Sequence, residues 1–485
     1  MMTPKSIALL LALALLLAGC GAQTPAPAPV AEPAPVATEP APAAPVATEP
    51  APAEPAPATA AAPALEPLPT WTPVATPQAG VLVADAGQPL GAISPLVYGT
   101  NFGPWVALRM ETIPLAEQAG ITLLRYPGGE WGDQNDLQPF QIDQFVDLAR
   151  RMGAEPYIHV RFRDSTPERA AATVQYAKDK GYHIRYWSIG NEPSLYEQGG
   201  HGWTAAEFAQ AWRGFAEAMR AVDPDIVLIG PEIHQYSGAP EVDPTDSLGQ
   251  DWMRTFLEIN GDQVDVVSFH RYPFPNNAAR ERATAGELRA NAPQWDEIIR
   301  RLRQTIRETT GRDIPVAVTE FNSHWTRSIS GETSPGSLLS GLWLGDVLGR
   351  LITQRVEMAA HFLLVSGSDH SDFGLLDRYD ARPPYYVYQL YKQFGQELLF
   401  ATSGIQNVSI YAAVRDDGAL TLMAINLGEE QVAAPLALAG FTPSGEAEVW
   451  RLDAEHNAEQ MESVELRDGG ELLLPAQSMT LYVMR

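Results

Sequence analysis

The sequence predicts an α/β protein in which a (β/α)₈ barrel is followed by a small all-β sandwich. The chain has 485 residues, well above the roughly 250–300 at which a single core stops growing, so two folded domains are expected. Within residues 80–395, apolar strand-like runs alternate eight times with helical patterns, which is typical of a parallel barrel. Within 396–485, short alternating runs and turn signals replace the helices, which is typical of a sandwich.

Residues 1–20 have the pattern of a lipoprotein signal peptide. Lys5 precedes the apolar stretch Ile7–Ala18, which is too short for the about 20 residues of a membrane-spanning helix but suits a secretory signal. The stretch ends in Leu17-Ala18-Gly19-Cys20, which resembles the bacterial lipobox, where the signal peptidase cuts before a cysteine that becomes lipidated. The alternative is an ordinary secretory signal. We expect a lipid anchor at Cys20 on the extracytoplasmic side of a bacterial cell envelope.

Residues 21–79 are expected to be a disordered linker. The segment is rich in Pro and Ala, with scattered Glu and very few bulky apolar side chains, so it cannot form a packed core. Proline density favours extended polyproline II. We therefore expect a semi-rigid tether that holds the folded part away from a membrane.

The predicted barrel strands are mostly continuous runs of Val, Ile and Leu, as expected for parallel strands buried on both faces. They are Leu96–Phe102, Ile121–Gly129, Glu155–Phe162, Tyr186–Glu192, Asp225–Ile233, Val264–Pro273, Pro315–Asn322 and Glu357–Val365. Amphipathic helical stretches such as Gln141–Met152 and Ala205–Val222 lie between them. A doubly wound open sheet is the competing interpretation.

Beyond Phe394 the strand-like runs are short and alternate with period two. Examples are Val408–Val414, Leu420–Asn426, Glu446–Leu452 and Leu472–Pro475. Turn signals such as Asp416-Asp417-Gly418 separate them. The early run Gly80–Ala84 precedes the barrel and is a candidate edge strand of this sandwich.

The charge of the chain argues against some partners. The formal net charge is −26, which repels phosphate backbones and anionic lipid surfaces, so neither nucleic acid nor direct membrane binding is expected. A neutral carbohydrate would be unaffected, whereas an acidic polysaccharide would need a basic patch that no Lys/Arg run supplies. Cys20 is the single cysteine, so no intramolecular disulfide is possible. The sequence does not predict the oligomeric state.

Polar residues close three of the predicted barrel strands, at the end of the barrel where active sites form. Strand four ends in Asn191-Glu192, strand six leads into His270 and Tyr272, and strand seven ends in Glu320 and Asn322. A carboxylate that closes an apolar strand costs free energy unless it is hydrogen-bonded or functional. Two facing carboxylates can divide acid and nucleophile roles between them. The alternative is that both acids merely cap the barrel mouth.

The tripeptide Asn191-Glu192-Pro193 after strand four, with Glu320 closing strand seven, resembles glycoside hydrolase clan A. The resemblance covers roughly residues 80–485. It implies a retaining glycosidase in which Glu192 is the acid/base and Glu320 the nucleophile. Asn191 resembles the residue that contacts the sugar 2-hydroxyl.

Three further residues fall where the clan has functional side chains. Arg125, at the end of strand two, is similar to the arginine beside the nucleophile. His270 and Tyr272 resemble the strand-six pair that orients and polarises the site. The alternatives are a core histidine for His270 and an unrelated ion pair for Arg125.

Within the clan, the run Leu124-Arg125-Tyr126-Pro127-Gly128-Gly129 resembles families 51, 39 and 79. These include arabinofuranosidases, β-xylosidases and heparanase-like β-glucuronidases, and they too carry a β-sandwich built from both chain ends. One departure is the end of strand eight, where many clan members have a tryptophan and this chain has Ser366-Gly367-Ser368-Asp369-His370. The floor of the sugar-binding subsite and the choice of family therefore stay open.

The resemblance implies hydrolysis of O-glycosidic bonds in a polysaccharide or oligosaccharide by double displacement. A carboxylate about 5–5.5 Å from a proton donor can form the covalent intermediate, and neither a metal nor an organic cofactor is needed. Arg125 and Tyr272 are expected to lower the pKa of Glu320, whose negative charge should raise the pKa of Glu192. The alternative functions are a non-catalytic glycan-binding lipoprotein and a transglycosylase.

Aromatic and polar loop residues complete the candidate site. Trp131 and Trp325 follow strand ends, where indoles can stack on sugar faces, although plain packing explains them equally well. Asp133 and His324 are candidates for specificity, with solvated loop side chains as the default. The sugar, its linkage and endo versus exo action are not predicted.

Overall fold

A computed structural model gives the positions of residues 78–274, 283–325, 331–366 and 372–485, all of which belong to one compact unit. The predicted signal peptide with Cys20, nearly all of the predicted linker, and the pair Asp369 and His370 lie outside the described residues. Within these four ranges, no helix is long and apolar enough to cross a membrane.

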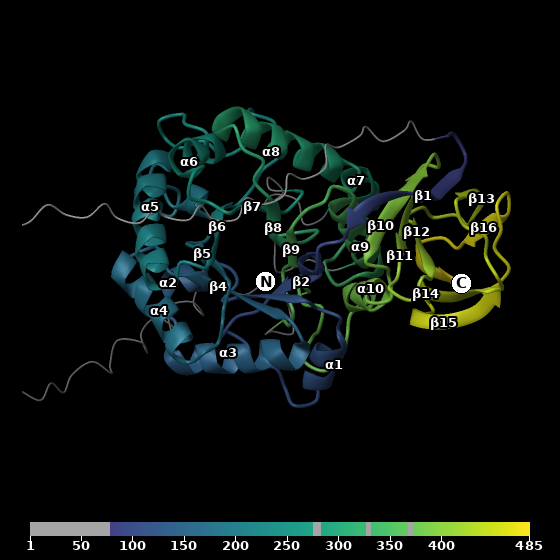
Figure 1. The fold of residues 1–485 in the computed structure, drawn as a ribbon, viewed down its shortest axis with the longest axis horizontal. Helices are drawn as coiled ribbons and strands as arrows, with labels where there is room; N and C mark the ends of the chain where they lie inside the picture. Colours follow the sequence, from purple (N-terminus) through teal and green to yellow (C-terminus); the bar gives the residue numbers. More distant parts are fainter. Residues whose placement is uncertain (1–77, 275–282, 326–330, 367–371) are drawn as a thin grey trace, which may run out of the picture. The chain divides into compact units, whose positions relative to one another are not determined.

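Eight parallel strands form a closed barrel, which confirms the predicted fold class (Figure 1). Their order follows the chain, and β9 pairs with β2 to close the ring. They are β2 (Gly99–Asn101), β3 (Leu123–Tyr126), β4 (Glu155–Val160), β5 (Tyr186–Ile189), β6 (Val227–Ile233), β7 (Val266–Arg271), β8 (Val316–Phe321) and β9 (Met358–His361). Because β1 belongs to a different sheet, predicted strands four and seven are β5 and β8.

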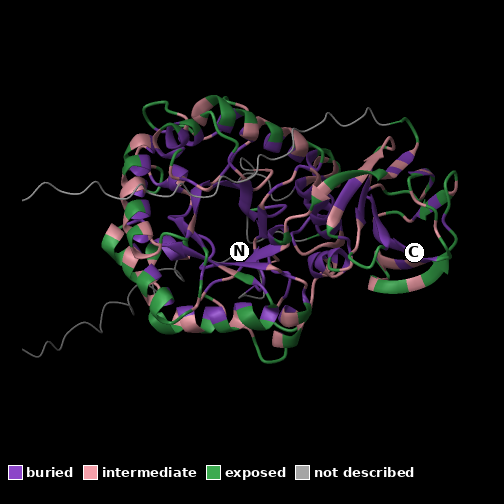
Figure 2. Ribbon diagram, in the orientation of Figure 1, coloured by how far each residue is buried: buried purple, intermediate pink, exposed green. Residues whose placement is uncertain are grey.

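Helices surround the barrel, and most of them bury one side, as the bands of purple and green in Figure 2 show, whereas α9 is buried on nearly all sides. They are α1 (Ile113–Gln118), α2 (Trp131–Gln134), α3 (Pro139–Met152), α4 (Pro167–Asp179), α5 (Ala205–Val222), α6 (Trp252–Asn260), α7 (Ala285–Asn291), α8 (Gln294–Thr310), α9 (Leu338–Thr353) and α10 (Pro383–Tyr391). Helix α5 begins with a capping box between Thr204 and Glu207. Helix α3 ends at Gly153, whose φ of 69° is left-handed and suits glycine.

The barrel interior changes from apolar to polar along the strands. Its apolar layer contains Leu123, Tyr157 and Val266. Alternate residues of a strand share a face. Arg125 therefore follows Leu123 on the inner face, two residues along β3, and His270 follows Val266 four residues along β7. The barrel therefore has an apolar floor, with charged groups gathered at its C-terminal end.

The remaining strands form one nine-stranded sheet in the order β15-β14-β17-β12-β11-β10-β1-β13-β16. They are β1 (Leu82–Ala92), β10 (Glu397–Ser403), β11 (Val408–Val414), β12 (Leu420–Asn426), β13 (Val432–Ala439), β14 (Ala447–Leu452), β15 (Asn457–Val464), β16 (Glu471–Leu474) and β17 (Ser478–Met484). Residues of strands at both ends of this order belong to one apolar cluster. The two ends of the sheet therefore face each other across a common core.

The early strand β1 joins this sheet, but not as an edge strand as we expected. It pairs with β10 on one side and with β13 on the other. Alternation along a strand predicts which face is buried but carries no information about strand order, which explains the error.

The other face of the sheet packs on the barrel domain. Tyr411 and Met479 share the large core cluster with residues of α9 such as Leu348, whereas Ile410 belongs to the cluster inside the sheet. The central strands β11, β12 and β17 are thus covered on both sides, which explains why all seven residues of β12 are buried.

The last barrel strand is shorter than predicted. Strand β9 ends at His361, and the apolar residues up to Val365 continue as irregular buried chain. The residue that follows the strand is therefore Phe362, not Ser366. Hydrophobic runs alone do not separate a buried strand from a buried loop, which explains the misplacement.

Candidate active site

The C-terminal ends of four barrel strands bring together six of the predicted site residues. They are Arg125 on β3, Asn191 and Glu192 after β5, His270 on β7, Tyr272 just beyond β7, and Glu320 on β8. Strands β7 and β8 pair so that His270 lies opposite Glu320. Arg125 contacts Glu320 across 195 residues of sequence.

The two predicted catalytic carboxylates lie close together. One ligand oxygen of Glu192 lies within 4.8 Å of one of Glu320. This spacing fits the about 5–5.5 Å of retaining glycosidases better than the roughly 6.5–9.5 Å of inverting ones. The Glu320 side chain is 6% exposed and the Glu192 side chain 21%. The pair therefore offers one enclosed carboxylate and one more open carboxylate.

Both oxygens of Glu320 are held. The Tyr272 hydroxyl donates to Oε1 at 2.6 Å, and Nη1 of Arg125 donates to Oε2 at 3.3 Å. Two donors on different elements fix the orientation of this carboxylate, as a nucleophile requires.

Arg125 is the hub of the site. It is fully buried, and its Nη1 also donates to Oδ1 of Asn101 at 2.8 Å. Its Nη2 donates to Oδ1 of Asn191 at 3.0 Å and to Oε2 of Glu232 at 2.5 Å. Arg125 therefore orients Glu320 and Asn191 together.

Glu192 is held by its backbone and by His270. Its φ of 48° is left-handed, and its amide donates to the Glu232 carbonyl at 3.0 Å. Its Oε1 lies 3.0 Å from Nδ1 of His270, whose Nε2 lies 3.3 Å from Oε2 of Glu232. The imidazole therefore bridges two carboxylates.

His270, Glu192 and Glu320 each shift the pKa values of the others. Burial lowers the pKa of His270, but Glu320, Glu192 and Glu232 together raise it to about 9, so the ring is an imidazolium that donates from both nitrogens. Burial opposes the ionisation of Glu192, yet the hydrogen bond and charge of His270 lower its pKa. Burial and the charge of Glu192 raise the pKa of Glu320, although His270, Arg125 and Tyr272 act in the opposite direction.

These directions are the reverse of those expected from the sequence for the two carboxylates. The expectation considered Arg125 and Tyr272, which act on Glu320, but not the direct contact between the His270 cation and Glu192. Of the two, Glu192 therefore has the lowered pKa and Glu320 the raised one.

Three residues of the cluster were not predicted. Glu232 near the end of β6 is fully buried, Asn101 is on β2, and Tyr157 on β4 donates to Oε1 of Glu232 at 2.8 Å. Glu232 carries the same signal as the two predicted acids, a carboxylate near the end of an apolar strand. The sequence does not single out Glu232, because no further motif surrounds it.

Asp133 and His324 are buried, so the default of solvated loop side chains is wrong for both. Asp133 accepts hydrogen bonds from the amides of Asn191, at 2.8 Å, and Phe162, at 3.0 Å. Helix α2, which follows β3, turns this carboxylate back toward the barrel. Asp133 thus supports the loop that carries the candidate acid/base.

The remaining predicted residues lie outside the hydrogen-bonded cluster in the described part of the chain. Trp131 begins α2 and is partly buried, and Trp325 is 42% exposed. Asn322 is buried, and its amide donates to the carbonyls of Phe362 and Phe373. Asn322 therefore anchors the chain after β9.

Phe362 takes the place at the end of β9 where the resemblance leads us to look for an aromatic side chain. Its ring lies 6.5 Å from the ring of Trp105, which is 37% exposed. A Cβ on Gly129 would come within 3.4 Å of it. An aromatic surface thus borders the site, on residues that the sequence did not indicate.

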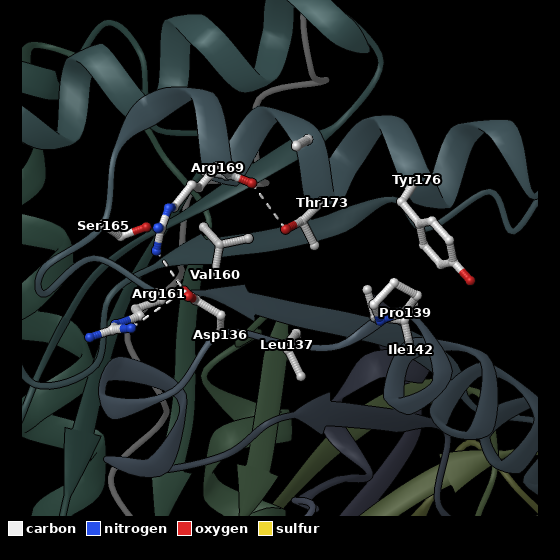
Figure 3. A pocket seen from close by; sticks show the side chains of 12 residues that line it. Asp136, Leu137, Pro139, Ile142, Val160, Arg161, Ser165, Arg169, Thr173 and Tyr176 are labelled. Carbon is white, nitrogen blue, oxygen red and sulfur yellow. Dashed lines mark hydrogen bonds and ion pairs between the residues drawn. The ribbon is translucent and has the colours of Figure 1, made fainter. Parts of the chain in front are cut away.

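A separate cavity of about 360 Å³ lies between α3, α4 and the end of β4 (Figure 3). Asp136 pairs there with Arg161 and Arg169. None of the predicted site residues lines this cavity.

Glu192, His270 and Glu320 also have ligand atoms close enough together to hold a metal ion. Their side chains are already engaged with one another, with Arg125 and with Tyr272. The ionic and hydrogen-bonded contacts thus account for the arrangement without a metal.

No protein-family model matches the chain. Curated relatives cover only part of it. An intracellular exo-α-(1→5)-L-arabinofuranosidase of Streptomyces lividans is 26% identical over 217 residues, 35% of this chain and 30% of that protein. The protein of the same name from Acetivibrio thermocellus is 25% identical over 259 residues, 44% of this chain and 48% of its own length. The chain thus spans less than half the length of both.

Solved structures match over most of the chain. The α-L-arabinofuranosidase of Thermotoga maritima, in complex with arabinose, has a TM-score of 0.67 at 18% identity and covers 83% of this chain and 99% of its own. The family 51 enzyme of Thermotoga petrophila has a TM-score of 0.68 at 18% identity and covers 84% and 100%. These matches confirm the barrel with its β domain, and the partial relatives agree with the predicted resemblance to glycoside hydrolases that include arabinofuranosidases.

Proposed function

We propose that the protein is a retaining glycoside hydrolase that acts on α-L-arabinofuranosides. The observation that carries the proposal is the pair Glu192 and Glu320, whose oxygens lie within 4.8 Å and whose surroundings differ. Glu320 is enclosed and fixed by Tyr272 and Arg125, which suits a nucleophile. Glu192 is more open, which suits a group that must reach both a leaving group and water.

Two displacements follow from this geometry. In the first, an oxygen of Glu320 bonds to the anomeric carbon as the glycosidic bond breaks, and Glu192 gives its proton to the leaving oxygen. In the second, Glu192 takes a proton from water, whose oxygen attacks the anomeric carbon and releases Glu320. Two inversions give net retention of configuration.

These roles require Glu192 to be protonated and Glu320 to be ionised when substrate is bound. The contact with His270 lowers the pKa of Glu192, and burial and the charge of Glu192 raise the pKa of Glu320. A leaving-group oxygen beside Glu192 accepts a hydrogen bond only from its protonated form, and positive charge developing at the anomeric carbon favours ionised Glu320. Substrate binding therefore favours protonated Glu192 and ionised Glu320.

The substrate class is proposed from the two partial relatives, both of which are arabinofuranosidases. The purified protein is tested on aryl α-L-arabinofuranosides beside aryl β-xylosides and β-glucuronides. We expect turnover of the arabinofuranoside with retention, read by proton NMR of the first product. Binding without turnover would instead support a glycan-binding protein, and a lengthened product would support a transglycosylase.

We also propose that Cys20 is lipidated, with residues 21–79 as the tether to a bacterial membrane. The support is the lipobox-like run that ends at the single cysteine. Mass spectrometry of the mature N-terminus tests this. We expect an acylated Cys20 as the first residue, and a free terminus at another residue would contradict the proposal.

A further inference from the structure

Glu232 is a third carboxylate beneath the two catalytic candidates, and it cannot act on substrate directly. The residue is fully buried. Its Oε2 accepts from Arg125 at 2.5 Å and from His270 at 3.3 Å, and its Oε1 accepts from Tyr157 at 2.8 Å. Both oxygens therefore face protein donors.

The backbone of Glu232 is as constrained as its side chain. Its φ of 61° lies in the left-handed region, which residues with a Cβ rarely adopt. Its amide donates to Oγ of Ser268 at 3.1 Å, and its carbonyl accepts from the amide of Glu192 at 3.0 Å. The same residue thus fixes the loop of the acid/base and the cation beside it.

His270 meets charged groups from several elements. Glu192 after β5, Glu232 on β6 and Glu320 on β8 attract the positive charge, while His234 after β6 opposes it. The proposed reaction changes the charge of Glu192 and of Glu320, because one exchanges a proton and the other forms an ester. Glu232 is the carboxylate of the three that keeps its charge throughout.

We propose that Glu232 is a positioning residue that serves as the permanent counter-ion of His270, keeping the imidazole charged so that Nδ1–H always donates to Glu192. The inference rests on the proposed function and adds to it a cause for the fixed orientation of Glu192. A neutral His270 would keep one N–H for two carboxylates, so its donation to Glu192 would no longer be permanent. The turnover number kcat should therefore depend on the charge of His270.

The test replaces the charge and keeps the shape. In Glu232→Gln the opposite charge beside His270 is lost, so its pKa should fall by about 1–3 pH units. At pH 8, where His270 then loses its charge, kcat should fall by at least about threefold while KM stays within about threefold of wild type. Glu232→Asp, which keeps the charge, should restore kcat at this pH.

Asp346→Asn is the matched control. Asp346 is a buried carboxylate that pairs with Arg350 and accepts from Tyr411, away from the barrel mouth. Its loss should leave kcat at pH 8 within about threefold of wild type. An equal fall of kcat in both variants, or a fall in neither, overturns the proposal.

A second readout does not depend on activity. Imidazole ¹⁵N NMR of the full chain, with the His270 signal assigned by its absence in His270→Gln, should show a pKa of about 9 in wild type and a lower one in Glu232→Gln. A wild-type value below 7 overturns the proposal, even if Glu232→Gln does not fold. If the His270 result holds while no glycoside is turned over, the proposed function fails and the counter-ion role stands.

Discussion

Two buried clusters in this protein use the same kinds of side chain. At the barrel mouth, Arg125 faces Glu232 and Glu320, and Tyr272 donates to one of these acids. Between α9 and the β-sheet, Arg350 lies between two acids in the same way. Its Nη1 is 2.5 Å from Asp296 and its Nε is 3.4 Å from Asp346, whose carbonyl accepts from the Tyr411 hydroxyl at 3.0 Å.

The two clusters differ in how many carboxylates surround their cations. At the mouth, three carboxylates surround two cations, and Glu192, the third, is partly open. At the sheet, two carboxylates flank one cation. Asp346 is 2% exposed and Asp296 35%, and Gln354 and Ser409 complete the contacts of Asp296 and Arg350. A partly exposed acid is thus common to both clusters, and the feature that suits the barrel mouth to chemistry is its pair of adjacent carboxylates with opposite pKa shifts.

The largest expected effect is on activity. Glu320→Gln keeps the shape of the nucleophile but cannot form the glycosyl ester, so kcat should fall by at least about 10⁴-fold. Thermal unfolding should change little, because the amide can still accept from Tyr272. Residual activity within tenfold of wild type would sink the assignment of Glu320.

The corresponding change at the sheet should act on stability. Arg350→Met leaves Asp346 and Asp296 without their cation, which should cost about 3 kcal/mol of unfolding free energy. Activity of the folded fraction should stay within about threefold. Urea unfolding and kcat are measured together, and a large loss of kcat without destabilisation would remove the distinction between the clusters.

The pH dependence of stability should reveal the charged histidine. The pKa of His270 is raised from 6.5 to about 9, so its contribution is complete below pH 6.5 and is lost as the pH rises to 9. The expected loss is on the order of 3 kcal/mol. Denaturant titrations at both pH values measure it, with His270→Gln as the control. An equal decline in that variant would contradict the charge assigned to His270.

A pair of hydroxyl deletions makes the smallest change. Tyr272→Phe removes a donor from Glu320 and should lower kcat about 10²-fold. Tyr411→Phe removes a donor from Asp346 and should lower stability by about 1 kcal/mol with kcat unchanged. If both variants lose only stability, Tyr272 does not support the nucleophile.

The barrel and its two leading acids could be predicted because long apolar runs that end in a carboxylate are a local signal. Glu232 gave the same local signal, but its importance lies in contacts with Arg125 and His270 that only the closed barrel creates. Phe362 was missed because the apolar run continues past the end of β9. The place of β1 in the sheet was predicted wrongly because alternation of apolar and polar residues indicates which face of a strand is buried. It does not indicate which strands lie beside it.

The roles of Glu192 and Glu320 are tested most directly by the configuration of azide products. In Glu192→Ala, an aryl α-L-arabinofuranoside with a good leaving group should still form the ester on Glu320. Azide, which needs no general base, should then attack from the opposite face and give a product of retained configuration. In Glu320→Ala, azide should enter from the vacated side and give the inverted product. Proton NMR distinguishes the two, and swapped configurations would show that the acid/base and the nucleophile have been assigned the wrong way round.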